Sequence, residues 1–235
     1  LLEYKLQLVD CKDKNDFDKY LVSIKNNGFR LLRLVNNLID ITKIDVNTFQ
    51  LHRGNFNIIE LVSSIVNSAR YYLEEKNRNF RYESEIDSEI IACDPFNIER
   101  VILNLISNAV KFTEAGDEIL LRIEKEADYI KISLRDTGIG IKKENQDIIF
   151  EHFRQVDQSF NKKREGSGIG LSLVKSIVEM HGGKITLDSL YGVYSRFSVY
   201  LPLETIDHKT LAAESYSADS LLNKVELEFS DINYI

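Results

Sequence analysis

The sequence has 235 residues, of which 43% are hydrophobic and 29% charged, and its formal net charge is −7. The length allows one sizeable globular domain with a smaller appendage, and the acidic balance argues against a general nucleic-acid binder, which would carry a basic surface. No apolar run reaches the roughly 18–20 residues that cross a bilayer, and the first residues lack the pattern of a signal peptide.

Residues 17–45 are predicted to form one long amphipathic helix. Residues 1–10 resemble the end of a preceding helix and 12–16 a polar turn, so residues 1–48 are expected to be a helical hairpin that is truncated at its start. The alternative is that both helices only cap the domain that follows. The apolar stripe of the long helix is wider than a two-stranded seam and is typical of a helical bundle; it comprises Phe17, Tyr20, Leu21, Ile24, Leu31, Leu34, Val35, Leu38 and Ile41.

From residue 49 to 203 the pattern changes to mixed helices and strands. Asn57 with Glu60 three residues later indicates a helix start, and Pro95 indicates another, whose helix continues to about Phe112. The other predicted elements are strands at 80–85, 90–93, 118–126, 129–135, 184–188 and 195–201, a helix at about 169–180, and a loop over most of 137–167. We therefore expect an α+β domain, a two-layer sandwich with helices on one face of a sheet.

Residues 204–235 form a polar tail with one apolar alternation, at Val225, Leu227 and Phe229. Alternation with a period of two predicts an additional strand at the sheet edge. The two cysteines, Cys11 and Cys93, are isolated and share no metal-ligand spacing. They suit a reducing compartment, so we expect this segment to lie in the cytoplasm, with any membrane anchor in parts absent from the sequence.

The first segment that carries chemistry lies on the predicted helix that ends at Phe112. Asn104, Asn108 and Lys111 are spaced by four and three residues, so they project from one helical face. Polar groups on an otherwise apolar helix are costly unless something polar lies opposite. An amide oxygen can contribute one ligand to Mg²⁺, which keeps phosphates and waters in its shell. The alternative is a polar helix edge that faces solvent.

Two glycine-rich segments follow. Asp136-Thr-Gly138-Ile-Gly140-Ile141 ends a predicted strand, where a carboxylate could accept a hydrogen bond from an adenine amino group beside a flexible backbone. Gly166-Ser167-Gly168-Ile169-Gly170-Leu171 precedes a helix whose N-terminus favours phosphate. Either pattern alone is also typical of tight turns. The second is not a Walker A loop, because Leu171 follows its last glycine.

Together and in this order, the segments resemble the ATPase domain shared by sensor histidine kinases, gyrase-type topoisomerases, Hsp90 chaperones and mismatch-repair ATPases, the GHKL group with the Bergerat-type fold. Two further segments resemble the sensor histidine kinases of two-component systems in particular. Residues 150–155 (FEHFRQ) resemble their phenylalanine box, and residues 30–40 (RLLRLVNNLID) the second helix of their dimerisation and phosphotransfer bundle. The resemblance covers roughly residues 1–203 and implies a mobile lid at about 142–167.

The resemblance also implies roles for individual residues, with ATP and Mg²⁺ as the ligands. Asn108 resembles the Mg²⁺ ligand and Asn104 its neighbour one turn earlier, while Lys111 resembles the phosphate contact. Phe112 resembles the ring against the adenine and Asp136 the adenine acceptor. The base pocket would be shaped by Gly138, Gly140 and Ile141, and the phosphate end by Gly166, Ser167, Gly168, Ile169, Gly170 and Leu171. Arg164 resembles a lid cation for the γ-phosphate, with Lys162 and Lys163 as alternatives.

The sequence departs from the family pattern at two places. A third glycine box, residues 192–197 (GVYSRF), has Tyr194 where the second glycine is expected, which predicts altered lid packing or nucleotide affinity. The second departure is the phosphoacceptor, a histidine followed by Glu or Asp on the first bundle helix. No histidine here has that context, so the acceptor is expected before Leu1; the four are His52, His152, His181 and His208.

The leading hypothesis is the core of an ATP-dependent protein histidine kinase. The resemblance implies transfer of the ATP γ-phosphate to a histidine, relay to the receiver domain of a response regulator, and a homodimer held by the helical segment. One alternative is a serine/threonine kinase of the anti-sigma type, which lacks the N-terminal bundle. Another is a non-catalytic, nucleotide-gated scaffold, which Tyr194 and the missing acceptor leave open.

Overall fold

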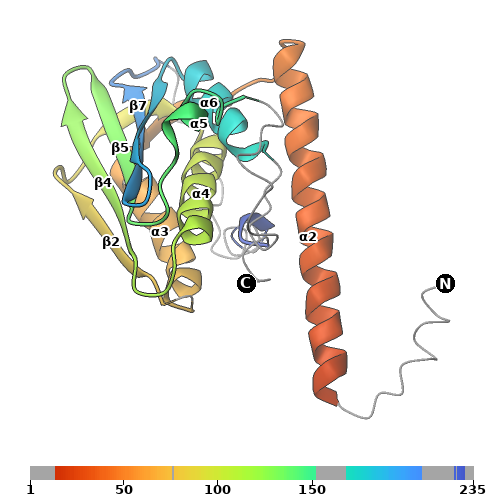
Figure 1. The fold of residues 1–235 in the computed structure, drawn as a ribbon. Coiled ribbons are helices and arrows are strands. Elements are labelled where there is room, and N and C mark those ends of the chain that lie inside the picture. The colour runs from red at the N-terminus through yellow and green to blue at the C-terminus, as the bar shows by residue number, and fades with distance from the viewer. Residues whose placement is uncertain (1–13, 76, 152–167, 208–224, 226, 231–235) are drawn as a thin grey trace.

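A long helix stands beside a layered α/β body in the computed structural model, which describes residues 14–75, 77–151, 168–207, 225 and 227–230 (Figure 1). The long helix is α2 (Lys14–Asp45). The helices of the body are α3 (Ile58–Glu75), α4 (Pro95–Phe112), α5 (Lys143–Gln146) and α6 (Gly170–Met180). Its strands are β1 (Gly54–Asn57), β2 (Asn79–Ser84), β3 (Ile90–Cys93), β4 (Glu118–Glu126), β5 (Tyr129–Asp136), β6 (Lys184–Leu190) and β7 (Tyr194–Pro202).

A five-stranded sheet in the order β2-β4-β5-β7-β6 forms one layer, and α3, α4 and α6 cover one of its faces (Figure 1). β2 runs parallel to β4, and the other neighbours are antiparallel. Alternate residues of the central strands face the helices and are buried, as the period-two pattern predicts; they include Ile119, Leu121 and Ile123 of β4 and Ile130, Ile132 and Leu134 of β5. The predicted α+β two-layer sandwich is confirmed.

The strand at Ile90–Cys93 lies outside this sheet. It pairs in an antiparallel two-stranded ribbon with β1, with Gly54 opposite Cys93. β1 is absent from the expected elements because its sequence, GNFN, is rich in residues that strands disfavour. The ribbon exists because β3 offers a partner edge. Within the predicted loop at 137–167, the described part contains one short helix, α5.

Two expectations for the ends of the chain need correction. α2 begins at Lys14, so residues 14–16 are helical rather than part of a turn, while the helix expected at 1–10 lies outside the described residues. The edge strand expected around Val225, Leu227 and Phe229 is wrong. These residues form a helical turn, in which the N–H of Phe229 donates to the carbonyl of Val225 at 2.9 Å. A turn places side chains four residues apart on one face, and here both are buried.

α2 is attached to the body near its C-terminal end. Ile41 is buried in the main hydrophobic cluster, Ile44 packs against that cluster, and α2 contacts α6. Among the described helices, none combines the length and apolar character needed to cross a membrane. The N-terminal part of α2 projects beyond the body (Figure 1).

Asp94 and His181 join the start of α4 to the end of α6. Asp94 is the N-cap of α4, and one carboxylate oxygen accepts hydrogen bonds from the backbone N–H groups of Phe96 and Asn97, both at 3.1 Å. Its own N–H donates to Nε2 of His181 at 3.0 Å, and Nδ1 of His181 lies 2.8 Å from the Ile177 carbonyl. Because Nε2 accepts, Nδ1 must carry the proton and donate. Neutral His181 therefore satisfies both contacts.

Acid should remove the stabilisation that His181 provides. Burial lowers the pKa of His181, and a proton on Nε2 would face the donor of Asp94. Because the pKa is lower in the folded than in the unfolded state, this contribution is complete above the ordinary histidine pKa and is lost as the pH falls below it. Compared with His181→Gln, the free-energy advantage of the unmodified chain should shrink by about 1 kcal/mol between about pH 8 and about pH 5.5.

Urea unfolding of both proteins at the two pH values measures this change. The difference between the proteins is needed because burial raises the pKa values of Asp136 and Glu228, whose contributions to stability change with pH in the opposite direction. An advantage that stays constant with pH would contradict the role given to His181.

Candidate functional site

Three polar side chains of α4 lie on one helical face, as the spacing predicts. Asn104 and Lys111 are buried and Asn108 is half-buried. Nδ2 of Asn104 donates to the Arg100 carbonyl at 3.1 Å, which leaves Oδ1 directed towards the start of α6. There, an added Cβ on Gly170 would lie 2.5 Å from Oδ1 of Asn104. The fold therefore packs the first segment directly against the end of the second glycine box.

The end of α4 meets the first glycine box. The N–H of Ile139 donates to the Phe112 carbonyl at 3.2 Å. A Cβ on Gly138 would lie 2.1 Å from that carbonyl oxygen, a contact that no side chain could make without a backbone shift. Phe112 itself is 36% exposed, so its ring stands at the rim of this junction rather than in the core. The ring and the first glycine box thus border the same space.

Asp136 ends β5 as a buried carboxylate. Its Oδ1 accepts a hydrogen bond from the Gly138 N–H at 3.0 Å, which fixes the side chain beside the loop. Burial raises the pKa of Asp136 to about 6, and the Gly138 hydrogen bond offsets part of that rise. Because folding raises the pKa, the stability contribution of the protonated group is lost as the pH rises through this value. At neutral pH Asp136 is therefore ionised and can accept hydrogen bonds, although its buried charge lowers the stability of the fold. Such a cost is typical of a functional group.

The first glycine box is held in place by residues that the sequence analysis missed. Oγ of Ser189 accepts the Ile141 N–H at 2.8 Å, and Gln146 donates to the carbonyls of Ile141 and Ser189 at 2.9 and 3.0 Å. Gly140, with φ +62°, approaches the Leu190 carbonyl. Ser189 and Gln146 carry no motif in the sequence; only the packing of α5 and β6 against this loop identifies them.

The phosphate end is described from Gly168 onwards. Gly168 has φ +68°, Ile169 is buried, and α6 begins at Gly170 without a side-chain N-cap. Leu171 is half-buried against the main hydrophobic cluster. A helix N-terminus without a capping side chain suits a phosphate ligand. The expectations for Gly166, Ser167, Arg164, Lys162 and Lys163 fall outside the described residues, as does the phenylalanine box beyond Glu151.

Asn108 is the candidate protein ligand for Mg²⁺. In the described parts of the chain, no group of three or more His, Cys, Asp or Glu side chains is arranged to hold a metal ion. A single amide oxygen fits a metal whose remaining ligands are phosphate oxygens and water. The donor set therefore fits Mg²⁺ that arrives with a nucleotide.

Tyr194 lies on the other side of the sheet from this site. In the register of β5 and β7, Asp136 pairs with the buried Ser195, so the neighbouring Tyr194 points to the opposite face. Its hydroxyl donates to Asp188 at 2.8 Å, and the guanidinium of Arg135 lies 5.1 Å from its ring centroid. Tyr194 therefore lies on the face of the sheet opposite Asp136, and its expected effect on lid packing or nucleotide affinity stays a prediction.

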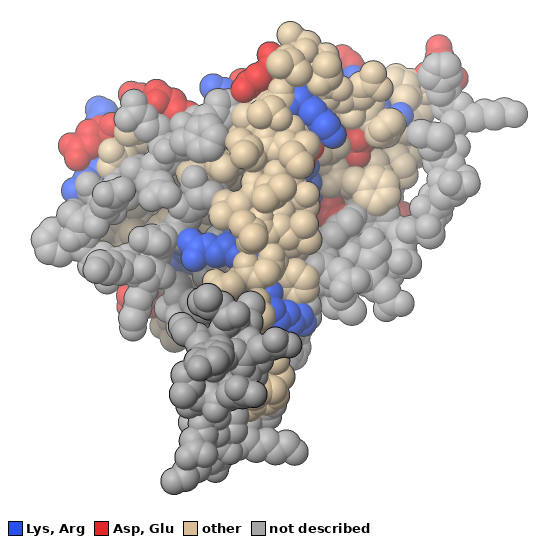
Figure 2. All heavy atoms as spheres, turned by 90° about the vertical axis from the view of Figure 1, so that its right-hand side faces the viewer, with Lys and Arg blue, Asp and Glu red and all other residues tan. Residues whose placement is uncertain are grey.

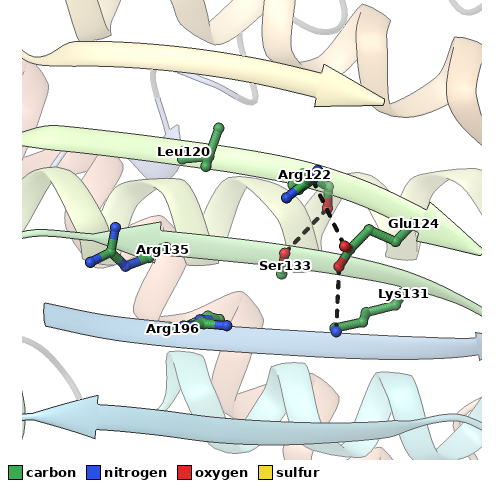
Figure 3. A pocket seen from close by; sticks show the side chains of 7 residues that line it. All are labelled: Leu120, Arg122, Glu124, Lys131, Ser133, Arg135 and Arg196. Atoms are coloured by element: carbon green, nitrogen blue, oxygen red, sulfur yellow. Dashed lines mark hydrogen bonds and ion pairs between the residues drawn. The ribbon is translucent and has the colours of Figure 1, made fainter. Parts of the chain in front are cut away.

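A shallow charged hollow marks this open face of the sheet (Figure 3). Lys131 and Arg122 both contact Glu124, at 3.3 and 3.8 Å, and the side chains of Arg135 and Arg196 lie on the neighbouring strands. The hollow is separated from α4 by the sheet itself, so it is distinct from the candidate nucleotide site.

Comparison with known proteins agrees with this geometry. The family of histidine kinase-, DNA gyrase B- and HSP90-like ATPases matches residues 93–205. The circadian input-output histidine kinase CikA of Synechococcus elongatus is 34% identical over 194 residues, which cover 80% of this chain and 25% of CikA. The chain thus spans about a quarter of the length of that relative.

Two solved structures show the same fold. Full-length ShkA in complex with AMPPNP has a TM-score of 0.69 at 26% identity, over 80% of this chain and 39% of ShkA. Histidine kinase ThkA in complex with the response regulator protein TrrA has a TM-score of 0.64 at 22% identity, over 85% of this chain and 55% of that one. The agreement extends beyond the family match, because both structures cover most of the chain.

Alanine substitutions at two glycines should have opposite effects on stability. Gly138→Ala forces a Cβ against the Phe112 carbonyl and should lower the free energy of unfolding by about 2 kcal/mol, as overpacking does. Gly28 lies inside α2 with nothing near its added Cβ, so Gly28→Ala should raise it by about 0.5 kcal/mol through helix propensity. Urea unfolding tests both. Equal effects would show that the Phe112–Gly138 junction is not under steric constraint.

Proposed function

We propose a function for this protein from one premise: the chain carries the catalytic ATP-binding domain of a sensor histidine kinase, in the family that also includes DNA gyrase B and HSP90. The domain binds Mg-ATP and transfers the γ-phosphate to a histidine, in a two-component signalling pathway. The observation that carries this proposal is the convergence of Asn104 with Gly170 and of Phe112 with Gly138, beside the buried carboxylate of Asp136.

Each described group has a place in nucleotide binding. Asp136, ionised above about pH 6, accepts a hydrogen bond from the exocyclic amine of adenine, while Phe112 offers its exposed ring to the base. Lys111 contributes positive charge for the phosphates. Asn108 contributes an oxygen to Mg²⁺, which neutralises phosphate charge when it is bound. Arg164 is proposed as a further cation for the γ-phosphate.

The phosphoryl acceptor is proposed to be a histidine other than the four of this sequence. None of the four is followed by Glu or Asp, and His181 is buried with both ring nitrogens engaged. Once phosphorylated, the acceptor would pass the group to the receiver domain of a response regulator. The known complex of ThkA with its response regulator TrrA supports this choice of partner. The reaction would take place in the cytoplasm.

The two alternatives are weakened by particular observations. Tyr194 is one reason to consider a nucleotide-gated scaffold, but its side chain lies on the face of the sheet opposite Asp136 and contacts Asp188 and Arg135. An anti-sigma type of kinase would have no use for the exposed apolar stripe of α2. We therefore favour histidine phosphorylation over both.

Two substitutions should separate the base from the phosphate end of the pocket. Asn108→Ala should weaken Mg-ATP binding about tenfold or more and leave adenosine binding nearly unchanged, because only the former uses the metal. Asp136→Asn should weaken both ligands, since the amide presents a donor where the pocket needs an acceptor. Isothermal titration calorimetry of both variants with both ligands checks this pattern. Equal losses for Asn108→Ala would remove Asn108 from the metal site.

Dimerisation through α2 is the second part of the proposal. Apolar side chains line the face of α2 that points away from the body, and the outward surface of the helix in Figure 2 is mostly uncharged. Leu31 and Leu38 are 64% and 45% exposed in the single chain. Such a continuous stripe is expected to pack against α2 of a second copy.

The double substitution Leu31→Asp and Leu38→Asp should therefore shift the chain towards the monomer. Light scattering over a range of protein concentrations measures the mass. Asn36→Asp is the matched control, because it adds a carboxylate at an exposed α2 position between the two faces and should leave the dimer intact. An unchanged mass for the double variant would exclude this stripe as the dimer interface.

A further inference from the structure

Five described residues near the C-terminus are docked on the body, although they belong to a polar tail. Val225, Glu228, Phe229 and Ser230 are all buried, and Leu227 is half-buried. The segment lies between α2 and the α3–α4 layer (Figure 1). It therefore fills space that would otherwise separate the long helix from the ATP-binding domain.

Contacts with three different helices hold this segment. Arg33 of α2 donates to the Glu228 carbonyl, and its guanidinium lies 3.7 Å from the Glu228 carboxylate. Oγ of Ser107 on α4 donates to the same carbonyl at 3.3 Å. The ring of Phe229 packs on Tyr72 of α3, with ring centroids 5.4 Å apart. One backbone carbonyl thus joins α2 to α4.

The ion pair at this junction is enclosed. The side chains of Arg33 and Glu228 are only 8% and 5% exposed. Burial raises the pKa of Glu228, and the charge of Arg33 opposes that rise. Removing either partner would leave a buried charge without its counter-ion, which is strongly destabilising. The segment is therefore recognised specifically and is not merely adsorbed on an apolar groove.

One face of α2 carries several of its contacts with the body. Arg33, Asn37, Asp40 and Ile44 follow at spacings of four, three and four, so they lie on one side of the helix. Arg100 of α4 donates to Asn37 at 2.9 Å and pairs with Asp40 at 2.7 Å. Ile44 packs on the core at the end of α2. The Arg33–Glu228 contact extends this attachment by one further turn towards the N-terminus.

We propose that Val225 and residues 227–230 form a clasp that fixes α2 on the ATP-binding domain and holds the kinase in a resting arrangement. Transfer needs the γ-phosphate in line with its acceptor, and a domain fixed on α2 is limited to one orientation relative to that helix. While the clasp is docked, the domain is attached to α2 from Arg33 to Ile44. Release of the clasp removes the attachment at Arg33 and keeps the Arg100 contacts and the apolar end of α2, so the domain gains freedom to reorient. The link to transfer rests on the proposed histidine kinase function.

Thiol labelling of the full chain tests the docking directly. A cysteine at Ser230→Cys, in a Cys11→Ser background, should react at least about tenfold more slowly than one at the exposed Asp207→Cys. Cys93 does not interfere, because burial raises the pKa of its thiol to about 12. Arg33→Glu should accelerate labelling at 230 by about tenfold.

Two controls make the result specific to the ion pair. Lys43→Glu reverses another α2 charge at an exposed position and should leave the labelling rate unchanged. Adding Glu228→Arg to Arg33→Glu should restore part of the slow labelling, because the ion pair returns in reverse although a glutamate at 33 cannot donate to the carbonyl of residue 228. A variant that had simply unfolded would not recover. Fast labelling at 230 in the unsubstituted background, or no response to Arg33→Glu, overturns the clasp.

Spin labels at Val22→Cys and Ser88→Cys, both exposed, report the orientation of α2 on the domain. Their distance distribution should be narrow with the clasp intact and should broaden in Arg33→Glu. In a longer chain that includes the acceptor, Arg33→Glu should also raise the initial rate of phosphorylation several-fold without changing Mg-ATP affinity. Broadened distances with an unchanged or lower rate overturn the resting-state role. No phosphorylation in either protein would instead contradict the proposed function, while the labelling and distance results still decide whether the clasp exists.

Discussion

The structure depends above all on α4, because this one helix must satisfy two different environments. One side of this helix is apolar and packs on the sheet, and the other carries two amides and an ammonium that we propose face the nucleotide. Both ends of the helix are therefore held by specific polar contacts. The start is fixed through Asp94 and His181, and the end through the Phe112 carbonyl and the first glycine box. With both ends fixed, Asn104, Asn108 and Lys111 keep their positions without help from a ligand.

Much of this arrangement could be predicted from the sequence because it is local. Alternation in β4 and β5, the Asn57 helix start and the three ordered segments each depend on residues close together in the chain. The resemblance then supplied what local patterns lack, namely that these segments meet. Contacts that depend on strand register could not be predicted from the sequence. Oγ of Ser189 accepts the Ile141 N–H because of the register in which β6 pairs with β7, and no pattern in the sequence marks Ser189.

The sequence predictions that failed share one cause. Where a segment has only a weak local preference for helix or strand, its tertiary partners decide its conformation. The residues of β1 are poor strand formers, yet they pair because β3 lies beside them. Around Val225 and Phe229 the spacing of apolar residues suits a strand as well as a turn of helix, and the groove between three helices selects the helix. Likewise, the sequence alone could not show which face of the sheet Tyr194 occupies, because that depends on the register of β5 and β7.

The order of the strands also has a consequence for solubility. The sheet is open, so β2 and β6 each leave one row of backbone groups unpaired by the rest of the sheet. Such edges invite strand addition from other molecules, and charged side chains on an edge discourage it. The exposed positions of both strands carry such charges, at Arg81 and Glu83 on β2 and at Lys184 and Asp188 on β6. These charges thereby protect both borders of the sheet from amyloid-like association with other chains.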